Sequence, residues 1–331
     1  MVKKVLLTGA TGFLGSHLAE SLITSGYAVR ALVRNPHTSS LNQQANLEIA
    51  IGDICQPNTL TKAVIGIDYV IHCAGAVKAY HSDLFYQVNT QGTRYLLEAV
   101  LKASHPIKRF VHLSSLAAAG PHVGDEPQRL IDQSIPVSHY GRSKLEAEKI
   151  IYQQYVQKMP ITIIRPPAIY GPGDQECLAF FKLVQWHLWP SFLSKNKRVS
   201  LIYVQDAADA ILCAMQNDQN SGNSYFIDDG HKYLIHDLIE VLKQTMQVKR
   251  VFNVRIPLLL LSWISSISEK YAKAVKKPTM ISKDKLSELM QQDWTCNSQL
   301  ANQQLGWHAN TDWKAGVLKT LTWYQQAGWI K

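Results

Sequence analysis

The chain has 331 residues, of which 46% are hydrophobic and 18% are charged, so it can bury a sizeable core and is not a disordered segment. Its five cysteines are scattered without a CxxC pair, which argues against a disulfide framework and predicts a reducing, cytoplasmic compartment. The formal net charge is +9. Because the basic residues are dispersed, we interpret this charge chiefly as solubility and expect no nucleic-acid partner.

Strand-like apolar runs alternate with amphipathic helical patterns up to Arg165. The runs are KVLLT, AVRALV, LEIAI, YVIHCA, RFVHLSS and ITIIR. Such strands, separated by helices, predict an α/β fold with a doubly wound parallel sheet that helices cover on both faces. We expect residues 1–165 to form this sheet domain. Residues 166–331 should form mostly a smaller, interleaved substrate-binding region, some elements of which return to the main sheet.

The segment TGATGFLG, at positions 8–15, joins the first strand to the first helix. Its glycines, Gly9, Gly12 and Gly15, permit a tight turn and a close approach of the backbone, and the helix N-terminus offers free N–H groups to a pyrophosphate. The segment therefore predicts a dinucleotide-binding turn, to which Thr11, Phe13 and Leu14 also belong.

The second strand ends in an arginine, where NAD-binding sheets of this kind usually carry an acid. No Asp or Glu occurs between Glu20 and Glu48, and Arg34 follows the strand AVRALV. A charge-assisted hydrogen bond to a ribose 2′-phosphate is worth about 1.5–3 kcal/mol. We therefore predict NADP(H) as the cofactor, with NAD(H) as the alternative.

Two further strand ends predict contacts with the same dinucleotide. Asp53, followed by Ile54, comes after the third strand, where a carboxylate can accept a hydrogen bond from an adenine amino group. Ala74, Gly75 and Ala76 follow the fourth strand, where small side chains let a flat ligand lie against the strand ends.

The stretch SHYGRSKLEAEK places Tyr140 four residues before Lys144, on one face of a predicted helix. Ser115 ends the strand before it, at the carboxyl edge of the sheet. Free tyrosine titrates about three pH units above neutrality, a gap of about 4 kcal/mol that a nearby ammonium group reduces by stabilising the phenolate. The three residues predict proton transfer at an oxygen whose carbon exchanges a hydride with a nicotinamide.

The chain resembles the extended short-chain dehydrogenase/reductase superfamily, in particular its NAD-dependent epimerase/dehydratase group. The motifs TGATGFLG, GDI, HCAGA, VNTQGT, LSS, YGRSK, RPPAIYGPGD and VQDAADAI occur in the family's order over nearly the whole length. The resemblance implies a Rossmann sheet and an enzyme with Ser115, Tyr140 and Lys144 as its catalytic triad, supported by Asn89.

The same resemblance implies contacts with the cofactor and with a second subunit. Pro167 and Ile169 match positions that line the nicotinamide, and Tyr140 and Lys144 also contact the cofactor. The helices that carry Asn89 and Tyr140 are implied to form a homodimer.

Two departures from the family pattern bear on the substrate. Ala168 stands where sugar-nucleotide members often place an asparagine, and Leu116 and Ala117 stand where dehydratases tend to have an acid. The chain therefore resembles more closely the reductase and 3β-hydroxysteroid-dehydrogenase-like branches. We predict an NAD(P)-dependent oxidoreductase acting on a secondary alcohol or ketone of a bulky, lipophilic substrate. The alternatives are a nucleotide-sugar epimerase or dehydratase and a non-catalytic dinucleotide-binding scaffold.

An apolar run in the C-terminal half of the chain is followed by several lysines. The apolar run IPLLLLSWISSI, at 256–267, is too short to span a bilayer, and a lysine-rich stretch follows it. A buried core helix is the first interpretation, and the alternative is peripheral membrane contact through 256–277.

His72, His112 and His139 lack a second ligand at metal spacing, so we expect structural roles for them and no metal site.

Overall fold

The structure is a computed structural model that describes residues 2–35, 46–122, 131–190, 196–219, 221–254, 256–279 and 282–330. A seven-stranded sheet lies at its centre, in the order β11-β6-β5-β4-β1-β2-β3, and each neighbouring pair of strands is parallel. Its strands are β1 (Lys4–Thr8), β2 (Ala28–Val33), β3 (Leu47–Ile51), β4 (Tyr69–His72), β5 (Arg109–Leu113), β6 (Ile161–Arg165) and β11 (Ser224–Phe226). The predicted doubly wound parallel sheet is confirmed.

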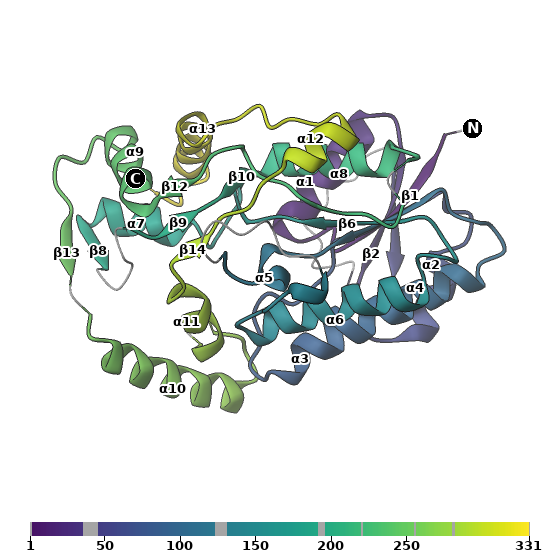
Figure 1. Cartoon of the computed structure of the whole chain (residues 1–331), viewed down its shortest axis with the longest axis horizontal. Coiled ribbons are helices and arrows are strands. Elements are labelled where there is room, and N and C mark those ends of the chain that lie inside the picture. Colours follow the sequence, from purple (N-terminus) through teal and green to yellow (C-terminus); the bar gives the residue numbers. More distant parts are fainter. Residues whose placement is uncertain are drawn as a thin grey trace.

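Helices cover both faces of this sheet (Figure 1). One face carries α1 (Phe13–Thr24), α8 (Val204–Gln216) and α12 (Gln299–Leu305), and the other carries α2 (Leu60–Ala63), α4 (Gly92–Lys102) and α6 (His139–Gln154). Short helical segments connect them: η2 (Pro57–Thr59), α3 (Asp83–Phe85), the π-helix η3 (Tyr86–Gln91), α5 (Leu116–Ala119) and η4 (Ile131–Gln133).

The apolar character of the strands follows from this double cover. Val5 and Leu7 of β1 are fully buried in the core beneath α1 and α8, whereas Leu6 between them is fully buried in the second core, beneath α2 and α4. Successive side chains of a strand point to opposite faces, so a sheet with helices on both faces needs apolar residues at every position.

The rest of the chain forms a smaller assembly at one end of the sheet (Figure 1). Its strands are β7 (Ala168–Tyr170), β8 (Leu188–Pro190), β9 (Arg198–Val199), β10 (Leu201–Tyr203), β12 (Tyr233–Leu234), β13 (Phe252–Val254) and β14 (Asp293–Trp294). Its helices are α7 (Leu178–Gln185), α9 (Ile235–Thr245), α10 (Leu258–Val275), α11 (Lys283–Leu289) and α13 (Trp313–Gln326). Between its segments, α8 and β11 return to the main sheet, where β11 pairs with β6.

The parallel topology fixes where a functional site can form. The carboxyl ends of parallel strands meet at one edge of a sheet, and ligands of open α/β sheets bind there. In this chain that edge carries the segments that follow β1, β4, β5 and β6. Within the described ranges, no helix combines the length and the apolar character that crossing a membrane requires.

Candidate active site

The glycine turn after β1 packs against the end of β4. Gly9 has a φ of +75°, and a Cβ atom there would lie 2.7 Å from the backbone nitrogen of Ala74. A Cβ atom on Gly15 would lie 2.0 Å from the carbonyl oxygen of Gly9. Only glycine allows both approaches. Gly12 is the N-cap of α1, which has no side-chain cap and no acidic residue in its first turn, so the N-terminus of this helix fits the phosphates of a dinucleotide.

The other residues of the turn have different surroundings. Thr11 is exposed, and the ring of Phe13 packs edge-on against His17, with centroids 5.7 Å apart. Leu14 is buried in the core, so only its backbone faces the turn. Thr8 joins the turn to β4, because its hydroxyl accepts a hydrogen bond from Ala74 N at 3.1 Å.

The predicted adenosine-side residues lie at the ends of β2 and β3. Arg34 is exposed just after β2. Its charge opposes the rise that burial causes in the pKa of Cys55, so the guanidinium lies near the segment that follows β3. One carboxylate oxygen of Asp53 accepts a hydrogen bond from Cys55 N at 2.9 Å, so this side chain also stabilises its own turn. Ile54 is buried and limits the space at Gly92.

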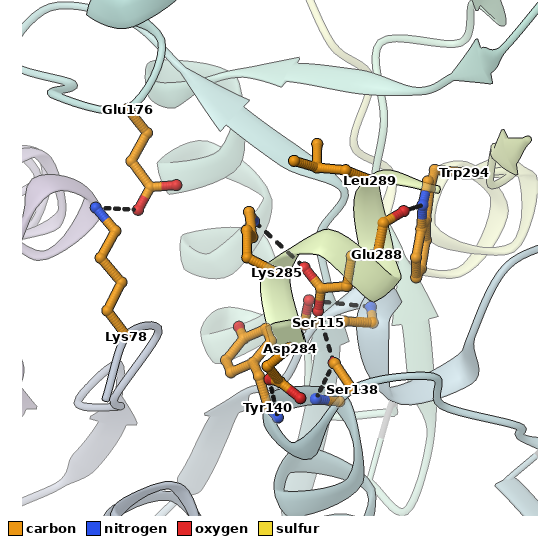
Figure 2. A network of polar contacts seen from close by, with 12 residues as sticks. Lys78, Ser115, Ser138, Tyr140, Glu176, Asp284, Lys285, Glu288, Leu289 and Trp294 are labelled. Carbon is orange, nitrogen blue, oxygen red and sulfur yellow. Dashed lines mark hydrogen bonds and ion pairs between the residues drawn. The ribbon is translucent and has the colours of Figure 1, made fainter. Parts of the chain in front are cut away.

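Tyr140 and Ser115 meet at the carboxyl edge of the sheet. Ser115 is the N-cap of α5, where its hydroxyl accepts a hydrogen bond from Ala117 N at 3.1 Å. The same side chain lies close to the phenol of Tyr140, and Figure 2 shows the two together. Burial raises the pKa of Tyr140, and Ser115 opposes that rise. Unless a positive group lies nearby, the phenol therefore keeps its proton at neutral pH.

Lys144 supplies that positive group one helical turn after Tyr140. The lysine is 4% exposed, and its ammonium donates a hydrogen bond to the carbonyl oxygen of Leu113 at 2.8 Å. A Cβ atom on Gly75 would lie 3.0 Å from Lys144 Nζ, so the lysine reaches the segment after β4. Burial lowers the pKa of Lys144 to about 8, which leaves a charged ammonium group at neutral pH.

Asn89 holds the segment after β4 in place. Its side-chain oxygen accepts from Ala76 N at 2.7 Å, and its amide donates to Ala76 O at 3.0 Å and to Ser143 Oγ at 2.9 Å. The residue lies in the π-helix η3, a helical form that is frequent at functional sites. Asn89 therefore ties Ala76 to the helix that carries Tyr140 and Lys144. Through these hydrogen bonds Asn89 positions the two segments next to it.

Pro167 and Ile169 follow β6 at the same edge. Pro167 is buried, and the preceding residue, Pro166, accepts a hydrogen bond from Leu116 N at 2.8 Å. Ile169 is half-buried in β7 and pairs with Ile202 of β10. The structure thus brings the predicted nicotinamide-side residues next to the segment that begins at Ser115.

The histidines that we expected to be structural are buried or engaged in hydrogen bonds. His72 contacts Thr8 Oγ1 at 2.7 Å and Thr93 Oγ1 at 2.9 Å, and burial lowers its pKa to about 3. His112 is also fully buried, and His139 contacts Tyr86 Oη at 3.1 Å. Across the part of the chain that the structure describes, no group of three His, Cys, Asp or Glu residues is arranged to hold a metal ion.

Sequence reasoning missed a buried ion pair behind the candidate catalytic residues. Glu148, one turn beyond Lys144, is fully buried and bonded to Arg165 at the end of β6, with Arg165 Nε at 2.9 Å from Glu148 Oε1. The same carboxylate accepts a hydrogen bond from Ser114. Tyr140, Lys144 and Glu148 are each four residues apart. This spacing could have placed Glu148 on the same helix face as the other two. The pair fixes the rotation of α6 against the sheet.

Sequence reasoning also missed a polar network that joins α11 to the start of α6 (Figure 2). Asp284 accepts hydrogen bonds from His139 N at 2.5 Å and Tyr140 N at 3.2 Å. Glu288 accepts one from Ser138 Oγ at 2.6 Å, and Ser138 in turn caps α6 by accepting from Gly141 N at 2.9 Å. A carboxylate at a helix N-terminus is stabilising. These partners lie some 145 residues apart in the sequence, so no local pattern predicts them.

An ion pair borders the same site from another side. Lys78, in the segment after β4, lies 2.9 Å from Glu176, just before α7 (Figure 2). Both Glu176 and Glu288 are close enough to Tyr140 to raise its pKa further. The site therefore lies between segments of the sheet domain and segments of the smaller assembly.

Comparisons with known proteins agree with this geometry. Residues 5–228 match the model of the NAD dependent epimerase/dehydratase family. The chain is 31% identical to a ceramide reductase from Caulobacter vibrioides over 330 residues, which cover 98% of this chain and 96% of that protein. It is also 28% identical to a UDP-glucose 4-epimerase from Vibrio cholerae, over 99% of this chain and 97% of that protein.

A solved structure shows the same fold. The structure of MoeE5 in complex with UDP-glucuronic acid and NAD superimposes with a TM-score of 0.77 at 21% identity, covering 98% of this chain and 99% of that chain. The resemblance inferred from the motifs is thereby confirmed: this chain belongs to the NAD dependent epimerase/dehydratase family, within the extended short-chain dehydrogenase/reductase superfamily.

Proposed function

We propose that this protein is an NAD(P)-dependent oxidoreductase that transfers a hydride between the nicotinamide and a secondary alcohol or ketone of a bulky, lipophilic substrate. The observation that carries the proposal is the position of Ser115 beside the phenol of Tyr140, with the buried ammonium of Lys144 one helical turn away. These groups stand at the strand edge that also carries the glycine turn.

Each residue has a distinct part in this reaction. The cofactor supplies or accepts the hydride, and the protein moves the accompanying proton. Tyr140 donates its phenolic proton to the carbonyl oxygen in reduction and takes it back in oxidation. Lys144 keeps a positive charge one turn away and lowers the free energy of the phenolate. Ser115 holds the substrate oxygen at the phenol, and Asn89 keeps Ala76 and α6 in register.

The substrate class rests on similarity and on two departures from the sugar-nucleotide pattern. The ceramide reductase is similar over 98% of this chain, and a ceramide is a lipid with a secondary hydroxyl group. Ala168 is exposed at the start of β7. Because its side chain is a methyl group, it offers no amide to a sugar nucleotide. The alternative, a nucleotide-sugar epimerase, is favoured by the 28% identity to the UDP-glucose 4-epimerase.

A substrate screen with a tyrosine variant tests the proposed function. The panel contains a ceramide with its 3-ketone derivative, a 3β-hydroxysteroid and UDP-glucose. We expect the lipid ketone to be reduced, and Tyr140→Phe to lower kcat about 10²- to 10⁴-fold, the usual contribution of general acid–base catalysis. The dissociation constant of the cofactor should change far less than kcat, because phenylalanine keeps the ring of the tyrosine. Tyr152→Phe, farther along the same helix, is the matched control.

Two outcomes would count against this assignment. Equal turnover by Tyr140→Phe and the wild type would exclude this tyrosine from catalysis. Turnover of UDP-glucose alone, together with NAD that remains bound through purification, would favour the epimerase.

We further propose NADP as the preferred cofactor. Arg34 is exposed beyond β2. No acidic residue that could contact the ribose hydroxyls occurs between Glu20 and Glu48. A charge-assisted hydrogen bond of about 1.5–3 kcal/mol corresponds to a preference of about 10- to 100-fold. In competing titrations, Arg34→Ala should lose this preference, whereas Arg142→Ala, an exposed arginine on α6, should keep it. A tenfold preference of the wild type for NAD would refute the proposal.

A further inference from the structure

The helix α10 presents an apolar face to solvent. Leu259, Trp263, Ile267, Tyr271 and Val275 follow one another at intervals of four, so they form one ridge along the helix. Trp263 is 72% exposed and Tyr271 is 69% exposed. The interpretation of this segment as a buried core helix is therefore wrong, because the side chains that looked like core residues in the sequence lie outside the core.

Only a narrow stripe of α10 faces the protein. Leu261, Ser265 and Ala272 are buried. Two polar contacts attach the helix to α11 and to the segment before it: Glu269 accepts a hydrogen bond from Lys283 N at 2.7 Å, and Ser268 is bonded to Thr279. Figure 1 shows α10 as a rod at the edge of the molecule, away from the central sheet. Its apolar ridge points outward.

Soluble proteins rarely leave so much contiguous apolar surface exposed unless it binds something. In the strand before the helix, Phe252 is 63% exposed and Val254 is 40% exposed. Exposed apolar side chains thus occur in β13 as well as along α10. Its tryptophan and tyrosine are residues that favour the boundary between lipid and water.

The charges around α10 indicate what covers it. Lys270, Lys273, Lys276 and Lys277 are all exposed in its second half and just beyond. The acid within this stretch, Glu269, is engaged with Lys283 N. The cores of protein–protein interfaces are depleted in lysine. In contrast, a row of lysines beside an apolar helix complements the negative surface of an anionic bilayer, to which each contributes about a fivefold gain in binding.

We propose that the α10 face, which comprises β13 and residues 258–277, docks on the surface of an anionic membrane. The helix would lie in the plane of the interface, with its apolar ridge among the acyl chains and its lysines at the headgroups. This inference does not depend on the proposed function, since it rests on the exposed side chains and charges alone.

The location of the face gives the docking a consequence for the site. The chain passes from α10 into α11, and α11 holds the start of α6 through Asp284 and Glu288. Figure 1 shows α11 beside α10. A bilayer at α10 would thus be linked to the end of α6 that carries Tyr140 through one intervening helix, α11.

Flotation of the full-length protein with lipid vesicles tests the proposal. We expect binding to vesicles of phosphatidylcholine with phosphatidylserine, and much weaker binding to phosphatidylcholine alone. Trp263→Ser with Ile267→Ser should weaken binding at least about tenfold, because two exposed apolar anchors are removed. Lys270→Gln with Lys273→Gln should weaken binding to the anionic vesicles by about 30-fold and leave the weak binding to phosphatidylcholine unchanged.

Matched controls separate this surface from general stickiness and from misfolding. Ile65→Ser with Leu318→Ser removes two exposed apolar residues elsewhere, and Lys149→Gln with Lys314→Gln removes two exposed lysines elsewhere. Both controls should bind vesicles like the wild type. All variants should keep the unfolding temperature and the cofactor affinity of the wild type, because the altered side chains are exposed.

Three results would overturn the proposal. The first is a wild type that stays in solution with both kinds of vesicle. The second is unchanged binding after the change at Trp263 and Ile267. The third is a wild-type dimer in light scattering that this variant converts to monomers without any binding to vesicles, because the face would then be covered by a second copy of the chain.

Discussion

Tyr140, Lys144 and Glu148 recur every four residues on α6, and each meets a different partner. Tyr140 meets Ser115, Lys144 reaches Leu113 O, and Glu148 is paired with Arg165. A helix brings residues four apart to one face. One face of one helix therefore carries the proton donor, the charge that tunes it and the buried ion pair that fixes the helix.

The buried ion pair predicts a large loss of stability in one variant. Glu148→Gln removes the carboxylate that pairs with the guanidinium of Arg165, which is 1% exposed. Breaking a buried pair in this way costs about 3–5 kcal/mol. Denaturant unfolding should show a free energy of unfolding lower by that amount. The exposed Glu146→Gln on the same helix should stay within about 0.5 kcal/mol of the wild type; equal effects of the two would contradict the prediction.

The buried Lys144 predicts a dependence of stability on pH. The unfolded chain keeps the lysine proton up to an ordinary pKa of 10.5, whereas the folded protein releases it near 8. Between these values the unfolded chain binds more protons, so the contribution of Lys144 to the free energy of unfolding rises with pH. Below pH 8 the lysine is charged in both states, so the whole cost of burying its charge lowers the free energy of unfolding.

Lys144→Met makes this contribution measurable. At pH 7 the variant should be more stable than the wild type by about 2 kcal/mol, which is the penalty of the shifted pKa less the lost hydrogen bond to Leu113 O. The difference should disappear between pH 8 and 10.5. Urea unfolding of both proteins over this range tests it, and a difference that does not vary with pH would exclude the linkage.

At the scale of elements, α11 supplies part of the N-terminal capping of α6. The helix α6 begins at its own cap, Ser138, but its first two N–H groups donate to Asp284 of α11. The start of the candidate catalytic helix thus depends on an element from the far end of the chain.

Removal of this contact should loosen the first turn of α6. Asp284→Ala leaves the N–H groups of His139 and Tyr140 without their partner and removes a negative charge from the helix N-terminus. We expect a loss of about 1–2 kcal/mol in stability and faster hydrogen exchange at these two amides. Ser287→Ala, on the same helix, is the control. Unchanged exchange at both amides would show that α11 does not hold this turn.

At the scale of the whole molecule, α13 packs on segments that lie about 150 residues earlier in the chain. Tyr324 donates a hydrogen bond from its phenol to Asp174 O in the loop that precedes α7. Tyr170 of β7 packs on α13 where Gly316 leaves room: a Cβ atom there would lie 2.2 Å from the phenol oxygen of Tyr170. The homodimer through the helices that carry Asn89 and Tyr140 and the cytoplasmic location stay predictions.

Gly316→Ala tests the packing of α13. Alanine favours a helix over glycine by about 1 kcal/mol, but its methyl group would collide with the fully buried Tyr170. Overpacking of a core costs about 1–3 kcal/mol, so we expect a net loss of stability in denaturant unfolding. Tyr170→Phe should reduce the cost of Gly316→Ala, because the nearest atom is then absent. A stabilised Gly316→Ala variant would contradict the packing.

The sequence by itself determined the parts of this protein that depend on local pattern. Apolar runs between helices gave the parallel sheet, because strands buried on both faces must be apolar throughout. The glycines of TGATGFLG and the spacing of Tyr140 and Lys144 are also local patterns, and the model of the family covers these segments.

Only the tertiary structure decided which distant groups meet and which surfaces stay open. The contact between Asp284 and His139 spans 145 residues, and no local periodicity encodes such a separation. The apolar run in α10 has the composition of a core helix, but a composition does not state what lies opposite. Burial depends on the neighbours that the fold brings to a residue. The exposure of Trp263 therefore follows only from the tertiary structure.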